Sequence, residues 1–150
     1  MSEHTPTYTQ SGWNLTELFA SFADPAINQA YQDLEASTEK FVSQREELKP
    51  EISSEKFLQL VRDLEEMNKL GYRLYGFASL NFAANTQDQT AQINIARFQQ
   101  FEAEMENRSL FFSLWWKALD DANAARLLDA SGDYRYWLEQ MRNFKPYTLS

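Results

Sequence analysis

The residue types that most often perform catalysis or bind transition metals are scarce in this sequence. It contains one histidine, His4, in a polar N-terminal stretch, and no cysteine. Zinc could therefore be held only by carboxylates, which is unusual for that metal. A serine–histidine–aspartate triad would require His4 to fold back onto the body of the protein, and the sequence has neither a Glu-x-x-His pair nor a Gly-rich phosphate loop. We therefore expect no catalytic residue, no metal ligand, no cofactor and no enzyme activity from this chain alone.

Carboxylates are the remaining groups that could perform acid–base chemistry. Candidates for such pairs are Glu65, Glu66, Glu102, Glu104, Glu106, Asp120 and Asp121. A solvated helix face is the more common role for acidic residues at these spacings. Asp120 and Asp121 also suit the end of one helix and the cap of the next.

Two tyrosines are candidates for a groove. Tyr72 and Tyr75 lie around Gly71 and Gly76, and they could face a channel. Core packing with a satisfied hydroxyl is the more frequent alternative. Glycine costs about 1 kcal/mol relative to alanine inside a helix, so these two glycines call for a reason. Close packing against a neighbouring helix is the favoured interpretation, and a hinge is the other.

Charge and composition limit the class of partner. The chain has 150 residues, 43% of them hydrophobic, and a formal net charge of -8. Nucleic-acid binding rests on lysine and arginine, so this balance argues against it and against an anionic membrane surface. No apolar run approaches the roughly 20 residues that span a bilayer, and no signal peptide is visible. We expect a cytoplasmic protein, which the absence of cysteine also fits.

Apolar residues recur at helical spacing along most of the chain, and no segment alternates with period two. We predict an all-α fold, an elongated antiparallel bundle with two or three long helices and two short C-terminal helices. Residues 1–14 form an irregular arm and residues 15–150 a single domain. The long helices are expected at about 24–48, 54–84 and 88–119, and the short ones at about 121–129 and 133–144.

The stretch LFFSLWWKALDD, residues 110–121, is the most unusual part of the pattern. Its apolar side chains spread nearly all round the predicted helix, which indicates burial on more than one side. The last predicted helix or a region outside this chain could supply the second cover. The interface candidates are Leu110, Phe111, Leu114, Trp115, Tyr134, Trp137, Phe144 and Tyr147. An uncovered patch of this size would promote self-association of the isolated domain.

The same residues resemble a known family. NRSLFFSLWWKALDD and the following RLLDASGDYRYWLEQMRNFKPYTLS are similar to the N-terminal region of the oligoendopeptidase F family, zinc metallopeptidases related to thimet oligopeptidase. The resemblance extends through WNLTELF near the N-terminus and through YRLYGFASL, and it covers nearly the whole chain. The two C-terminal segments are its most specific parts.

The resemblance implies a part of a larger enzyme. Members of the family are all-α hydrolases that cleave short peptides in a deep channel, with zinc bound by a His-Glu-x-x-His helix and a later glutamate in the C-terminal catalytic region. No position here matches that motif, so no zinc ligand is carried over, and the chain resembles a detached, truncated N-terminal domain. Its implied function is that of a non-catalytic wall or lid of the peptide channel, with the catalytic region and short peptides as partners. The alternative is a free-standing helical-bundle protein that binds a partner through its aromatic end.

Overall fold

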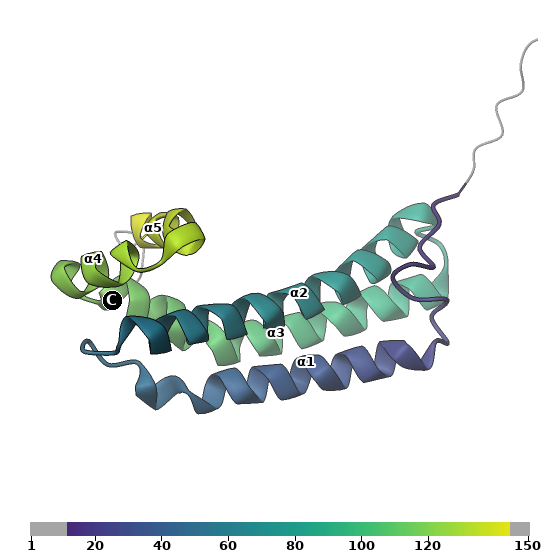
Figure 1. The fold of residues 1–150 in the computed structure, drawn as a ribbon. Helices are drawn as coiled ribbons and strands as arrows, with labels where there is room; N and C mark the ends of the chain where they lie inside the picture. Colours follow the sequence, from purple (N-terminus) through teal and green to yellow (C-terminus); the bar gives the residue numbers. More distant parts are fainter. Residues whose placement is uncertain (1–11, 145–150) are drawn as a thin grey trace, which may run out of the picture.

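The computed structural model describes residues 12–144, and within this range it contains helices and no strand. Three long helices run antiparallel in succession, and two short ones lie together at one end (Figure 1). The helices are α1 (Pro25–Ser43), α2 (Ser54–Ala84), α3 (Gln89–Ala118), α4 (Asp121–Asp129) and α5 (Arg135–Asn143). The predicted all-α bundle is confirmed.

Side-chain caps set where the helices begin. The Asp24 carboxylate accepts a hydrogen bond from the Ala26 amide, and Pro25 occupies the first turn of α1. Ser53, Asp88 and Asp120 cap α2, α3 and α4 through their side-chain oxygens. Each cap satisfies amides that have no partner inside the helix.

One predicted helix end was wrong. α1 ends at Ser43 rather than near residue 48, and a single 3-10 turn, Arg45–Glu47, follows it. At this point the Ser43 hydroxyl donates to the Lys40 carbonyl, and the Gln44 amide group donates to Asp63 on α2. These side-chain bonds compete with continuation of the helix.

The last α-helix begins at Arg135, two residues after the predicted start near 133. Gly132 has φ +51°, a left-handed conformation that glycine adopts without steric cost. The residues Gly132–Tyr134 form a 3-10 turn that leads into α5.

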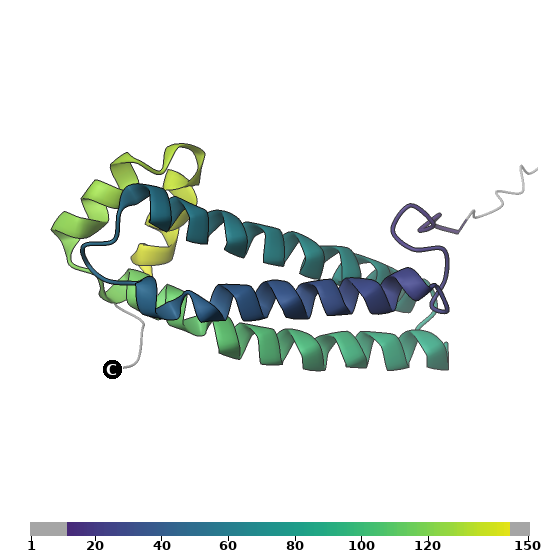
Figure 2. The ribbon, with the colours of Figure 1, turned by 60° about the horizontal axis from the view of Figure 1, so that its bottom comes forward.

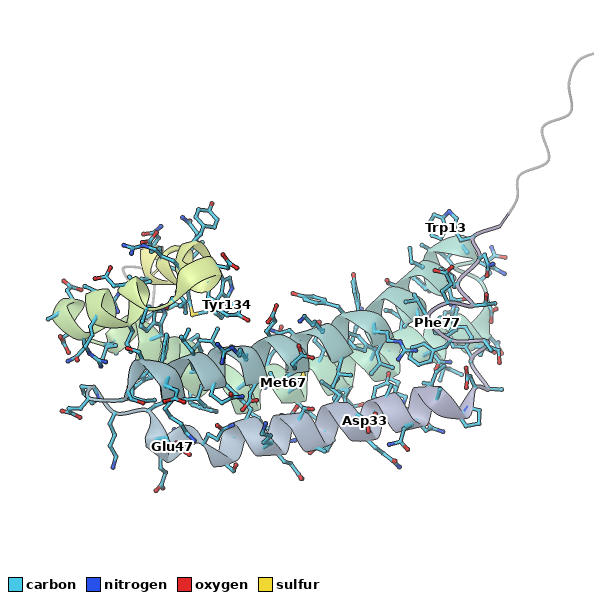
Figure 3. The ribbon with its side chains drawn as sticks, in the orientation of Figure 1. Trp13, Asp33, Glu47, Met67, Phe77 and Tyr134 are labelled. Atoms are coloured by element: carbon cyan, nitrogen blue, oxygen red, sulfur yellow. The ribbon has the colours of Figure 1, made fainter. Side chains whose placement is uncertain are left out.

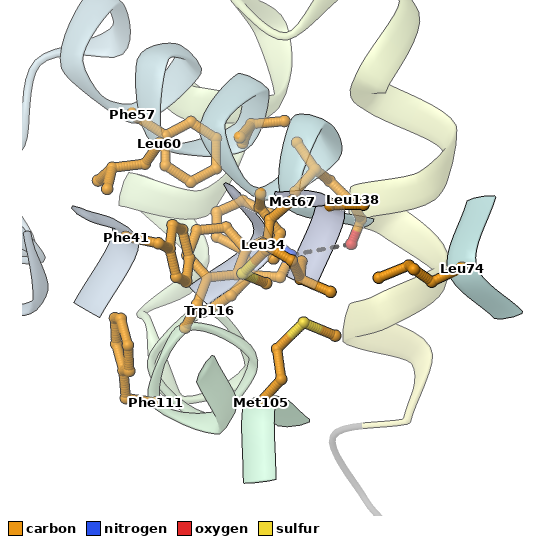
Figure 4. Close-up of a cluster of buried hydrophobic side chains, with 14 of the residues drawn as sticks. Leu34, Phe41, Phe57, Leu60, Met67, Leu74, Met105, Phe111, Trp116 and Leu138 are labelled. Carbon is orange, nitrogen blue, oxygen red and sulfur yellow. Dashed lines mark hydrogen bonds between the residues drawn. The ribbon is translucent and has the colours of Figure 1, made fainter. Parts of the chain in front are cut away.

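The core lies among the three long helices, with α1 seated against both α2 and α3 (Figure 2). Several of its largest side chains gather where the bundle meets the short helices (Figure 4). Phe57 of α2 stacks on Trp116 of α3 with ring centroids 5.1 Å apart, and Phe41 of α1 stacks on Phe111 at 5.3 Å. These rings bury a large apolar area at one end of an elongated molecule.

The glycines of α2 do not mark sites of unusually close packing. A Cβ at Gly71 would lie 3.8 Å from the Met105 side chain, and one at Gly76 would lie 3.8 Å from Leu18. Both are ordinary van der Waals distances, and α2 continues through both positions without interruption. The expectation that these glycines are needed for close helix packing was wrong.

The segment before α1 docks on the opposite end of the bundle through its phenylalanines. Phe19 and Phe22 each make an edge-on contact with Phe77 of α2. The Arg73 guanidinium donates to the Leu18 carbonyl at 2.8 Å and lies over the Phe19 ring. Trp13 is mostly exposed at the edge of this end (Figure 3), so the phenylalanines and Arg73 hold the segment rather than this tryptophan. The predicted arm lies, for residues 1–11, outside the described residues.

Candidate binding groove

The last helix of the chain supplies part of the second cover for the aromatic cluster. Trp116 is fully buried, and its indole Nε1 donates to the Leu138 carbonyl of α5 at 2.9 Å (Figure 4). The Arg142 guanidinium lies over the Trp116 ring and donates to the Trp116 and Leu119 carbonyls at 2.6 and 3.0 Å. Because these carbonyls belong to the C-terminal end of α3, one arginine both ends α3 and holds α5 against it.

The predicted interface residues on α3 divide into two groups. Phe111 is only 9% exposed, because α1 already covers it, so its assignment to an open interface was wrong. Trp115 is half-buried against Phe57. Leu110 and Leu114 are 49% and 42% exposed and form the uncovered part of the cluster.

The predicted residues of the last segment lie mostly at the surface. Trp137 and Phe144 are exposed, and Tyr134 is half-buried. Tyr147 lies outside the described residues.

A groove of about 390 Å³ separates α2 from α5. Figure 1 shows the two short helices, α4 and α5, lying across one end of α2. Figure 3 shows Tyr134 on the side of these short helices that faces α2. The groove is lined by Val61, Glu65, Asn68, Lys69, Tyr72, Tyr134 and Trp137. It therefore brings together Tyr72, predicted to face a channel, with Tyr134 and Trp137, predicted to form an interface.

A hydrogen bond joins the two sides of this groove. The Tyr134 hydroxyl donates to the Glu65 carboxylate at 2.7 Å, which joins residues that are far apart in the sequence. This bond raises the pKa of Tyr134 and lowers the pKa of Glu65. The Lys69 ammonium bridges Glu65 at 3.4 Å and Glu66 at 2.8 Å. The only cation among the lining residues is thus already neutralised by carboxylates.

A smaller cleft between α2 and α3 adjoins the groove. It has a volume of about 90 Å³, and Asn68 and Tyr72 line both spaces. Its α3 side includes the carboxylates Glu102 and Glu106. Burial raises the pKa of Glu102 above its ordinary value, and the nearby charge of Glu106 adds to the rise.

Tyr75 takes no part in lining either space. Its ring packs on Phe98 of α3 at 5.6 Å between centroids, and the residue is 45% exposed. Of the two predicted channel-facing tyrosines, the structure therefore brings only Tyr72 to the groove.

The sequence analysis named neither Val61 nor Asn68 as a candidate site residue, although both line the groove. The spacing 61, 65, 68, 69 and 72 does place these residues on one helical face. The missing information was that α5 would turn back over that face.

The remaining chemistry of the described residues is limited. Within residues 12–144, no group of three or more histidine, cysteine, aspartate or glutamate side chains is arranged to hold a metal ion.

In the same part of the chain, none of the helices combines the length and apolarity needed to cross a membrane.

Comparisons with known proteins give no relative. No family model, no curated protein and no solved structure matches this chain.

Proposed function

We propose that this chain is a non-catalytic helical domain of a larger zinc oligopeptidase similar to oligoendopeptidase F, and that its α2–α5 groove forms part of the wall of a peptide channel. The observation that carries the proposal is the groove itself. It places an exposed tyrosine and an exposed tryptophan, Tyr72 and Trp137, around a half-buried Tyr134. Aromatic rings of this kind give large contact areas to peptides of varied sequence.

The proposed role is to bind and confine the peptide rather than to cleave it. The described residues provide no zinc site, so the metal and its ligands would belong to the catalytic region of the parent enzyme. Tyr72 and Trp137 would contact apolar side chains of the substrate, and the hydrogen bond between Tyr134 and Glu65 would hold the wall in shape. A wall of fixed shape narrows access to the channel and excludes folded proteins.

We further infer a cytoplasmic location for this domain. The absence of cysteine from all 150 residues supports a reducing compartment, where disulfides do not persist. A fluorescent fusion found outside the cytoplasm would contradict this inference.

The reading frame that encodes the chain tests the relationship to the peptidases directly. We expect a His-Glu-x-x-His motif to be encoded C-terminal to Ser150, and a frame that closes without one contradicts the proposal. As a second test, the 150-residue chain incubated with Zn²⁺ and fluorogenic peptides is expected to show no metal-dependent turnover.

A free-standing interaction protein is the second candidate, and the exposure of Leu110 and Leu114 favours it. In that case the chain would bind a partner or a second copy of itself through the outer side of α3. Sedimentation equilibrium tests the self-association: we expect a concentration-dependent increase in mass that Leu110→Glu abolishes. A strictly monomeric chain at high concentration, with no binding of a hydrophobic dye, contradicts it.

A further inference from the structure

We propose that the α2–α5 groove and the adjoining α2–α3 cleft act as one site for a short peptide that carries an apolar residue beside a lysine or arginine. The inference rests on the proposed function and adds the class of peptide that this wall selects. The aromatic groove provides the anchor, and the charge of the cleft decides the occupant.

The two spaces adjoin each other. Asn68 and Tyr72 line both of them, and no helix among the described residues covers α2 on this side beyond α5 (Figure 1). Tyr72 is 71% exposed, so it can meet a ligand without any rearrangement of the core. A peptide side chain seated between Tyr72 and Trp137 would therefore place its neighbour near the cleft.

The cleft has an uncompensated negative charge. Among the described residues, no side chain forms an ion pair or hydrogen bond with the carboxylate of Glu102 or that of Glu106. Glu102 is half-buried, and its pKa is raised by burial and by Glu106. A cation in the cleft would relieve this repulsion, which an anionic or neutral side chain cannot do.

The ring of Tyr72 adds to the selection of a cation. An ammonium or guanidinium group over an aromatic face is attracted by the ring quadrupole. The aliphatic stem of lysine or arginine also suits a cleft whose other walls include Gly71, Phe98 and Met105. Lys69 does not oppose such a ligand, because Glu65 and Glu66 neutralise it.

A matched pair of peptides tests the selection on the 150-residue chain. We would titrate ¹⁵N-labelled protein with N-acetylated, C-amidated Gly-Phe-Lys-Gly and with the same peptide in which norleucine replaces lysine. The amide chemical shifts of α2 and α5 would report binding. We expect the lysine peptide to bind about fivefold more tightly. This ratio corresponds to about 1 kcal/mol, which two weak charge pairs with Glu102 and Glu106 would contribute together. This preference should decrease as salt is added.

Variants separate the charge from the groove. The double change Glu102→Gln and Glu106→Gln should reduce the affinity for the lysine peptide to that of the norleucine peptide. Glu104→Gln, on an exposed position that lines neither space, should leave the preference unchanged. Tyr72→Ala should weaken binding of both peptides.

The outcomes distinguish this inference from the proposed function. Equal affinity for the two peptides, or a preference that survives the double glutamine variant, overturns the selection for a cation. Absence of binding by either peptide overturns the site. Neither result decides the relationship to the peptidases, which the downstream reading frame tests separately.

Discussion

Arg142 gives the most direct test of how α5 is held against the end of α3. Its side chain is only 13% exposed, and the guanidinium contacts three acceptors and one ring at the end of α3. Replacement of Arg142 with methionine keeps an apolar stem of similar length but removes every donor. The change therefore isolates the polar contacts from the packing of the stem.

The expected cost follows from those contacts. Two hydrogen bonds to backbone carbonyls contribute about 1 kcal/mol each. The pair with Asp121 adds little, since that carboxylate is 93% exposed. Stacking of the guanidinium over Trp116 adds about 0.5–1 kcal/mol. The free energy of unfolding should therefore decrease by about 2–3 kcal/mol.

Urea denaturation followed by far-ultraviolet circular dichroism measures this loss. With a denaturant slope of about 2 kcal/mol/M, the midpoint should shift down by about 1 M. Arg142→Lys should recover less than half of the loss, because an ammonium cannot reach the carbonyls and the carboxylate with the geometry of a guanidinium.

Arg135 provides a matched control on the same helix. It forms two exposed ion pairs, with Asp129 and Glu139, and contacts no carbonyl of α3. Arg135→Met should leave the midpoint nearly unchanged. A midpoint for Arg142→Met that equals that of the Arg135 control would refute the role assigned to Arg142.

Three further changes test the bundle. Burial alone would raise the pKa of Asp63, but hydrogen bonds, led by that from Lys40, outweigh it and hold the pKa below its ordinary value. A carboxylate whose pKa is lowered by folding stabilises the folded state above its unfolded-state pKa, and this stabilisation is lost as the pH falls through the folded-state pKa. In Asp63→Asn, the urea midpoint should therefore decrease less steeply below about pH 5. Gly71→Ala should raise the free energy of unfolding by about 1 kcal/mol, because the new Cβ meets Met105 at an ordinary distance; a decrease in the urea midpoint would contradict this. Phe57→Ala should lower it by about 3–5 kcal/mol in the same assay, because Phe57 is fully buried, and a loss below 1 kcal/mol would show that its stacking is dispensable.

Helix positions followed from local signals in the sequence, whereas helix ends depended partly on distant residues. Asp24, Ser53 and Asp120 cap helices whose starts the sequence pattern predicted, because capping involves only neighbouring amides. The end of α1 differed because Gln44 turns toward Asp63 on another helix. The pattern of apolar residues within 24–48 cannot predict a contact with another helix.

The groove could not be predicted because it depends on the path of the chain after α4. Helical spacing places Tyr72 on the surface of α2 but does not reveal what lies above it. The left-handed turn at Gly132 and the bond from Tyr134 to Glu65 return α5 to that surface. A different tertiary contact explains the error at Phe111, which Phe41 of α1 covers.

The uneven distribution of aromatic side chains along the bundle has a consequence for local opening of the structure. The rings of Phe57, Phe112 and Trp116 connect α2, α3 and α5 at one end of the molecule. Because these elements share the same buried contacts, the amides of α5 should exchange with deuterium as slowly as those at the end of α3. A short helix of nine residues would otherwise fray rapidly in water. Helix α5 and the end of the bundle that carries these aromatic rings should thus open as one cooperative unit.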